Sequence, residues 1–170
     1  LSDIVVVDNS SDDGSAGQIG ELFPMVRLVA LETNVGLSVA RNIGLGLLRT
    51  PLALLLDHDV YVGPDSVERM VAAYVKHQPA VVCPRIRLFP ERHIVQTDGA
   101  SLHFVGTLSL RNAYRDVAAT PQASGFVDGA IGACLLLDRA KVIAAGGFNE
   151  LFFFYFEDLE IALRLRLRGE

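Results

Sequence analysis

Two carboxylates stand one residue apart directly after a strongly apolar run, in "LLLDHDVYV" at residues 54–62. Burying an unpaired carboxylate is costly, so we expect Asp57 and Asp59 to face solvent or a ligand. Two carboxylates at this spacing can approach one divalent cation, and Mg²⁺ or Mn²⁺ favours oxygen ligands shared with substrate phosphates. Alternate residues of an extended chain point in opposite directions, so His58 is expected to be structural or to lie behind the metal ligands. The pair alone is weakly specific.

A second acidic group, "YFEDLE" at residues 155–160, follows an aromatic run. One interpretation is that Glu157 and Asp158 stabilise the N-terminus of a helix through its dipole. The other is that an aromatic pocket desolvates one carboxylate and raises its pKa into the range useful to a general base. The residues alone leave both interpretations open.

The elements that would position these acids alternate between apolar strands and amphipathic helices. This order predicts a three-layer α/β domain with a mostly parallel central sheet. Pro84 predicts that the fourth strand lies at an edge or contains a bulge. Hydrophobic periodicity predicts strands at 4–7, 26–30, 52–56 and 80–88, and helices at 15–23, 37–49 and 63–77.

The second half of the chain has a weaker pattern until residue 129. Residues 89–128 contain a candidate strand pair near 102–110, and irregular segments of this kind are typical of binding loops or of disorder. From residue 129 the pattern predicts a strand, a short helix and a Gly-Gly turn. The final "IALRLRLR" fits a period of two as well as a period of four, so periodicity does not decide between strand and helix.

Polar residues follow several of the predicted strands at the point where each strand ends. Ligands of open α/β sheets bind beyond the carboxyl ends of the strands, so these residues are expected to act together. Each loop alone also has an ordinary explanation as a helix cap or a turn. The residues are Asp8, Asn9 and Ser10 after the first strand, 32–36 after the second, and Asp57, His58 and Asp59 after the third.

Composition predicts a single globular domain over residues 1–170, because 51% hydrophobic residues suffice for one core. A net charge of -5 without a Lys/Arg-rich run argues against nucleic-acid binding. The apolar runs are far shorter than the roughly 20 residues of a membrane-spanning helix, and no signal-peptide pattern is visible. Cys83 and Cys134 are too few for a disulfide framework and are predicted to be core residues in a reducing compartment.

Taken together, the motifs resemble those of the family 2 glycosyltransferases, which have the A-type, Rossmann-like nucleotide-sugar-binding fold. The resemblance spans nearly the whole chain except the middle section, and it implies that the last segment is helical. The blocks that carry it are "VVVDNSSDDGS", "NVGLSVARNIGL", "LLLDHDV", "GAIGACLLLDR" and "GGFNELFFFYFEDLEIALRLRLRG".

The resemblance also implies roles for individual residues. Asp8 would contact the nucleobase, and Asp59 would be the more direct ligand of Mg²⁺ or Mn²⁺. The residues implied around the nucleotide and metal are Asp8, Asn9, Arg41, Asn42, Asp57 and Asp59.

The same comparison implies a floor for the sugar and acceptor, made by Gly129, Gly132 and Ala133. Asp158 would be the base that deprotonates an acceptor hydroxyl, with Glu157 as its neighbour. The reaction would be metal-dependent transfer of a hexosyl or deoxyhexosyl group, with inversion of configuration. A nucleoside-diphosphate sugar would be the donor.

A saccharide or lipid-linked saccharide would be the acceptor, as in polysaccharide biosynthesis. The family's usual location predicts a cytoplasmic protein with peripheral association at the inner face of the membrane. Family members begin with a further strand and helix and continue past the equivalent of Glu170, so we expect a fragment that can lack activity by itself.

Other functions remain open at the level of residues. A phospho-receiver signalling module could use the acidic cluster at 8–13, but Lys76 and Lys141 are poorly placed for its required lysine. A phosphohydrolase with Asp-x-Asp chemistry usually needs Thr or Ser and Lys, whereas Val60 and Tyr61 follow the pair here. A domain of the same fold that only binds nucleotide is the third alternative.

Overall fold

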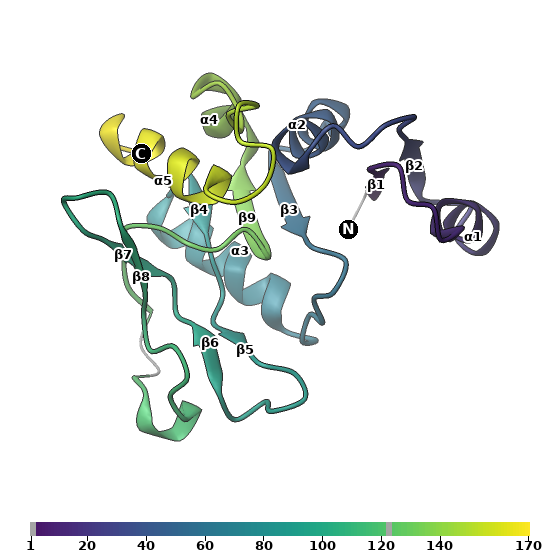
Figure 1. The fold of residues 1–170 in the computed structure, drawn as a ribbon. Helices are drawn as coiled ribbons and strands as arrows, with labels where there is room; N and C mark the ends of the chain where they lie inside the picture. The colour runs from purple at the N-terminus through teal and green to yellow at the C-terminus, as the bar shows by residue number, and fades with distance from the viewer. Residues whose placement is uncertain (1–2, 122–123) are drawn as a thin grey trace.

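The computed structural model describes residues 3–121 and 124–170, and it has an α/β architecture (Figure 1). Short strands alternate with helices in the first half, a region of short antiparallel strands follows, and two helices close the chain. The elements are β1 (Val5–Asp8), α1 (Ser15–Leu22), β2 (Arg27–Ala30), α2 (Leu37–Leu47), β3 (Leu52–Leu56), α3 (Ser66–His77), β4 (Val81–Val82), β5 (Ile86–Arg87), β6 (Val95–Thr97), β7 (Ala100–Leu102), β8 (Leu108–Leu110), a 3-10 turn (Val117–Ala119), β9 (Cys134–Asp138), α4 (Arg139–Ala144) and α5 (Glu157–Leu167).

The sheet that carries the core has the strand order β3-β9-β4. Strand β9, "CLLLD", pairs antiparallel with both neighbours, so β3 and β4 run in the same direction on either side of it. Side chains of β9 alternate between two apolar clusters. Leu135 and Leu137 pack with residues of α2, α4 and α5, whereas Cys134 and Leu136 pack against α3. The sheet is therefore covered by helices on both faces (Figure 1).

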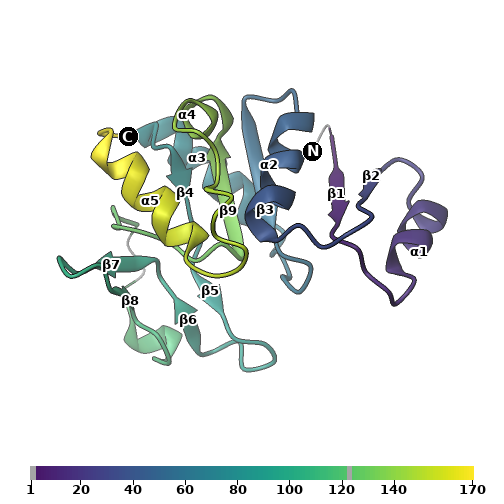
Figure 2. The same cartoon turned by 45° about the horizontal axis from the view of Figure 1, so that its top comes forward.

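Strands β1 and β2 form a separate parallel pair, with Val5 opposite Arg27. Helix α2 lies between this pair and the β3-β9-β4 sheet (Figure 2). Gly44 of α2 faces the side chain of Val7, and Leu45 enters the core on the other side. Within the described residues no strand pairs with the second edge of β1 or of β3. The α/β class is confirmed, whereas the expectation of a mostly parallel central sheet is not, since β1 with β2 is the one parallel ladder of the described residues.

The predicted strand at 80–88 is wrong as a single element. It is divided into β4 and β5, which join different sheets on either side of Pro84. Proline lacks the N–H that a continuous ladder needs, and here it marks the place where the chain changes partner. The candidate strand pair near 102–110 is confirmed as the β7–β8 hairpin, in which Leu102 pairs with Leu108.

The helices agree with the sequence in position and type. α1, α2 and α3 lie within the predicted ranges, and α5 shows that the ambiguous final segment is helical. Cys134 is buried in the core, as predicted, and burial raises the pKa of its thiol to about 11. Cys83 is only partly buried and packs at the margin of the core. No helix in the described ranges has the length and apolarity needed to cross a bilayer.

Candidate functional site

The Asp-His-Asp motif lies directly beyond the end of β3. The backbone N–H of Asp57 donates to the carbonyl of Ala133 at 3.0 Å, which ties the motif to the segment before β9. Asp57 is half-buried, whereas His58 and Asp59 are exposed. In the parts of the chain that the structure describes, no hydrogen bond or ion pair engages the carboxylate of Asp59.

A buried arginine connects this motif to the second acidic group. Arg41 of α2 is 6% exposed. Its Nη2 donates to Oδ1 of Asp57 at 3.1 Å, and its Nη1 donates to Oε1 of Glu157 at 2.7 Å. Its Nη2 also donates to the carbonyl of Gly132 at 3.2 Å. Four segments that are distant in sequence thus meet at one guanidinium group.

Gly132 extends the network to Asp158. Its N–H donates to Oδ2 of Asp158 at 2.9 Å, and the N–H of Leu159 donates to Oδ1 of the same carboxylate at 2.8 Å. A Cβ atom at position 132 would lie 2.6 Å from both terminal nitrogens of Arg41, closer than real contacts allow. Only glycine therefore permits the backbone to approach the guanidinium group this closely.

The acidic pair occupies the first turn of α5. Glu157 is 3% exposed, and Asp158 is half-buried. This position agrees with the interpretation that the helix dipole favours both carboxylates. The preceding aromatic side chains do not close a pocket over them, since residues 153–156 are each more than half exposed. The proposed aromatic desolvation of the base is therefore not the arrangement observed.

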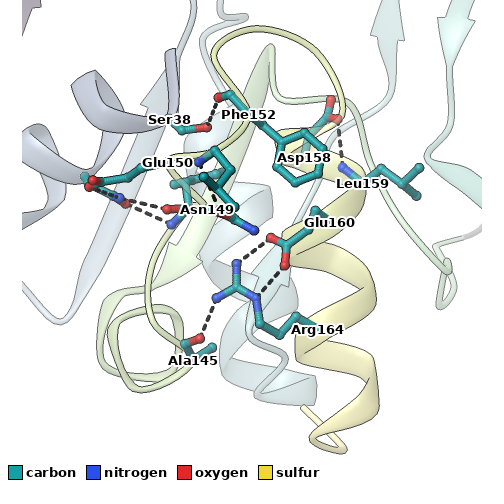
Figure 3. A network of polar contacts seen from close by, with 12 residues as sticks. Ser38, Ala145, Asn149, Glu150, Phe152, Asp158, Leu159, Glu160 and Arg164 are labelled. Atoms are coloured by element: carbon teal, nitrogen blue, oxygen red, sulfur yellow. Dashed lines mark hydrogen bonds and ion pairs between the residues drawn. The ribbon is translucent and has the colours of Figure 1, made fainter. Parts of the chain in front are cut away.

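The loop before α5 is fastened to the start of α2 (Figure 3). Ser38 donates its hydroxyl to the carbonyl of Phe152 at 2.7 Å, and the N–H of Leu37 donates to the carbonyl of Phe153 at 2.7 Å. Gly36 has a φ of 85°, and a Cβ there would lie 2.8 Å from Phe153. This contact explains the glycine of "NVGLS", which brings α2 and the acidic turn together.

Asn42 fastens the beginning of the same loop. Its side chain donates to the carbonyl of Phe148 at 2.8 Å and accepts from the N–H of that residue at 2.8 Å. Its Nδ2 also donates to Glu150 at 3.0 Å. In this structure the Asn42 amide is occupied by the loop.

The polar loop after β1 is organised by its own side chains. Asp8 is 8% exposed and accepts from the N–H of Ser11 at 3.2 Å. Asn9 accepts from the N–H of Val35 and donates to Asn34, both at 2.9 Å. The loops after β1 and β2 are thus joined, as expected if they line one edge of the sheet.

Two buried polar atoms of the site have no hydrogen-bond partner among residues 3–121 and 124–170. They are Nε of Arg41 and Oε2 of Glu157. No group of three His, Cys, Asp or Glu side chains among the described residues could enclose a metal ion. Asp57 and Asp59 provide two carboxylates, which suffices for a cation that takes its other oxygens from substrate phosphates and water.

Sequence reasoning placed Arg41 near the nucleotide but missed its link to both acidic motifs. It also missed Ser38, which is 0% exposed. The available signal was a charged residue inside the apolar helix "LSVARNIGL", because a buried arginine needs acidic partners. Nothing in the sequence indicated which acids these are.

Comparisons with known proteins establish the class. The family model described as "Glycosyl transferase family 2" matches residues 1–120. The chain therefore belongs to glycosyl transferase family 2, as its motifs indicated.

The curated relatives include a rhamnosyltransferase and a succinoglycan biosynthesis protein. The chain is 28% identical over 189 aligned residues to the N-acetylglucosaminyl-diphospho-decaprenol L-rhamnosyltransferase of Mycobacterium tuberculosis, which covers 98% of this chain and 61% of that protein. It is 40% identical over 70 residues to the succinoglycan biosynthesis protein ExoO of Rhizobium meliloti, or 41% of this chain and 20% of ExoO. The chain thus spans about three fifths of the length of the rhamnosyltransferase.

Solved structures confirm the fold. The chain resembles S. aureus TarS residues 1–349, with a TM-score of 0.64, 18% identity, and coverage of 97% of this chain and 46% of that one. It also resembles the mannosyltransferase PcManGT of Pyrobaculum calidifontis in complex with GDP-Man and Mn²⁺, with a TM-score of 0.64, 15% identity, and coverage of 98% and 43%.

Proposed function

We propose that this chain forms the donor-binding and catalytic region of an inverting, metal-dependent glycosyltransferase. It would transfer a hexosyl or deoxyhexosyl group from a nucleoside-diphosphate sugar to an acceptor hydroxyl. One observation carries the proposal: Arg41 and Gly132 join the acids after β3 to the acids that open α5. Family membership supports the same reaction class.

The residues present fit a divalent cation bound together with a diphosphate. No residue in the described ranges pairs with the carboxylate of Asp59, and Asp57 bonds to Arg41 through Oδ1 and not through Oδ2. Carboxylate oxygens of these two residues would hold Mg²⁺ or Mn²⁺. The mannosyltransferase PcManGT, whose fold this chain resembles, is in complex with Mn²⁺. Such a cation, when bound, supplies positive charge to the departing diphosphate.

Asp158 is the proposed base. Two backbone N–H groups, from Gly132 and Leu159, fix the direction of its carboxylate. Asp158 would accept the proton of the acceptor hydroxyl while that oxygen bonds to the anomeric carbon. The bond from this carbon to the diphosphate oxygen breaks on the opposite side, so one displacement inverts the configuration. Gly129 and Ala133 would shape the floor of this site.

The nucleoside would lie along the loops after β1 and β2. Asp8 and Asn9 are proposed to contact it, because Asn9 joins both loops. Arg41 and Asn42 are proposed to act near the nucleotide through the groups that they hold. The signalling alternative is not favoured, since Asp8 is buried and Lys141 is engaged by Glu170 at 2.8 Å.

The acceptor is proposed to be a saccharide or a lipid-linked saccharide. The rhamnosyltransferase relative is named for a diphospho-decaprenol acceptor, which carries a long lipid. A lipid-linked acceptor would place the protein peripherally at the cytoplasmic face of the membrane.

We further propose that one more strand completes the sheet between β1 and β3. Both strands have one edge without a strand partner in the described ranges, and α2 packs across both. Exposed strand edges are rarely left unpaired in the middle of a sheet. A sheet completed in this way would fix the β1 loop relative to Asp57.

Thermal unfolding with and without nucleoside diphosphates tests the proposed function. UDP, GDP and dTDP are each added with Mn²⁺ at about 100 times the Kd, and the cognate one is expected to raise Tm by roughly 5–10 °C. Asp59→Ala should remove this shift. His58→Ala is the matched control, because His58 is also exposed and is not expected to bind the metal. Equal shifts without Mn²⁺, or in Asp59→Ala, would refute the role of Asp59.

A further inference from the structure

We infer that Arg41 is a positioning residue, which divides the four carboxylates of the site into two that it holds and two that it leaves open to ligands. Arg41 holds Asp57 and Glu157 directly. Within the part of the chain that the structure describes, neither Asp59 nor Asp158 forms a hydrogen bond or ion pair with the guanidinium. The inference rests on the proposed function, and it assigns Arg41 an action through other residues in place of direct nucleotide contact.

Burial shows that Arg41 is enclosed by protein. Its side chain is 4% exposed, and that of Glu157 is also 4% exposed, whereas that of Asp57 is 34% exposed. A guanidinium so enclosed has little surface left for a nucleotide. Asp57 is the member of the ion-paired group that reaches solvent, so the effect of Arg41 on a ligand would pass through Asp57.

The charges explain why the position requires arginine. Two carboxylates near one another in a partly buried site repel, and one cation between them offsets this repulsion. The planar guanidinium can donate in two directions at once, with Nη1 to Glu157 and Nη2 to Asp57. A lysine keeps the charge but lacks this geometry.

The held geometry also reaches the proposed base. Gly132 accepts from Arg41 through its carbonyl and donates through its N–H to Asp158. One peptide segment therefore links the guanidinium to the carboxylate that would take the proton. Shifting Arg41 is expected to shift Asp57 and Asp158 together.

The first experiment needs no ligand. Thermal unfolding of the full chain is compared for the wild type, Arg41→Met, Glu157→Gln and the double variant. Arg41→Met leaves Glu157 buried without a cation, so Tm should fall by on the order of 10 °C. The double variant should recover at least half of this loss, because no buried charge remains unpaired. Additive losses would overturn the inference.

The second experiment measures the action through Asp57. The Kd of the cognate nucleoside diphosphate with Mn²⁺ is measured by calorimetry for Arg41→Lys, Asp57→Asn and the double variant. Arg41→Lys should weaken binding about 3–10-fold, and the double variant should bind no more weakly than Asp57→Asn. If the fold-losses in affinity of the two single variants multiply in the double variant, Arg41 contacts the nucleotide independently of Asp57. That result would overturn the inference.

Arg164→Met is the matched control for both experiments. Arg164 also pairs with a carboxylate on α5, that of Glu160 at 2.5 Å, as Figure 3 shows. Its hydrogen bonds within the described residues go to Glu160 and Ala145, not to the partners of Arg41. It should leave the Kd unchanged, and a weakening as large as that of Arg41→Lys would overturn the inference. If the wild type binds no nucleoside diphosphate with Mn²⁺, the proposed function fails and the positioning role with it. If the wild type binds but the effects of the single variants simply add in the double variants, the positioning role alone is overturned.

Discussion

Two arginine–aspartate centres in this protein differ in how completely their acids are satisfied. In the region of short strands, Asp98 accepts from Arg85 through both oxygens, at 2.5 and 2.7 Å, and from Asn112 at 2.7 Å. At the end of β3, Arg41 engages one oxygen of Asp57 and one of Glu157. The first centre has no carboxylate oxygen left over, whereas the second has several.

This difference separates a structural ion pair from a candidate site. Every oxygen of Asp98 has a protein donor, so that centre is complete without a ligand. Around Arg41, no described residue pairs with the carboxylate of Asp59, and Oε2 of Glu157 is buried without a partner among the same residues. Carboxylate oxygens without protein partners are the groups to which the proposed divalent cation would bind.

The largest effect that would sharpen the comparison is expected for Asp158→Asn. Loss of the base should lower transfer from the donor to a lipid-linked saccharide about 10²–10⁴-fold. The Mn²⁺-dependent Tm shift with nucleoside diphosphate should stay unchanged, because Asp158 is not among the proposed donor ligands. Released nucleoside diphosphate measures the transfer, with Asp98→Asn as the control from the satisfied centre. Full activity of Asp158→Asn would remove Asp158 from the mechanism.

An intermediate effect is expected for Gly132→Ala. The added methyl group would displace the guanidinium of Arg41, and overpacking of this kind costs about 1–3 kcal/mol. We expect Tm to fall by roughly 3–10 °C. Gly46→Ala is the control, since a Cβ there meets open space within α2 and alanine favours the helix. Equal Tm values for the two variants would show that the close approach at Gly132 is unimportant.

The smallest effect concerns the pH dependence of the satisfied centre. Burial alone would raise the pKa of Asp98, but the hydrogen bonds from Arg85 and Asn112 outweigh it and lower this pKa below 3.8. The stabilisation is therefore present above the unfolded value of 3.8 and is lost as the pH falls through the lower folded value.

Thermal unfolding of the wild type and Asp98→Asn between pH 6 and pH 3 tests this sign. The difference in Tm should be constant above about pH 5 and should shrink as the pH falls below about 4. A difference that grows toward acid pH would contradict the assignment of Asp98 as an ionised, fully paired group.

Some features of the fold follow from local sequence and others do not. The helices have a clear periodicity and the strand ahead of Asp57 is a continuous apolar run, so their positions were predictable. The direction of β9 was not, because an apolar run such as "CLLLD" is the same in a parallel and an antiparallel ladder. The sequence also did not indicate that Arg85, next to the break at Pro84, pairs with Asp98, thirteen residues further along the chain.

The candidate site shows the same division. Four acids of the site were identifiable from the sequence, because a carboxylate next to an apolar run is costly to bury without a partner. They are Asp57, Asp59, Glu157 and Asp158. The role of Gly132 was not visible, since a glycine does not reveal which group approaches it. Pairing of Arg41 with acids 16 and 116 residues away is a property of the tertiary structure alone.

Anomalous diffraction from crystals grown with Mn²⁺ and the cognate nucleoside diphosphate tests the central claim most directly. We expect one manganese peak coordinated by carboxylate oxygens of Asp59 and Asp57, with the diphosphate on its open side. A peak at Asp98, or a bound diphosphate with manganese distant from Asp59, would contradict the account.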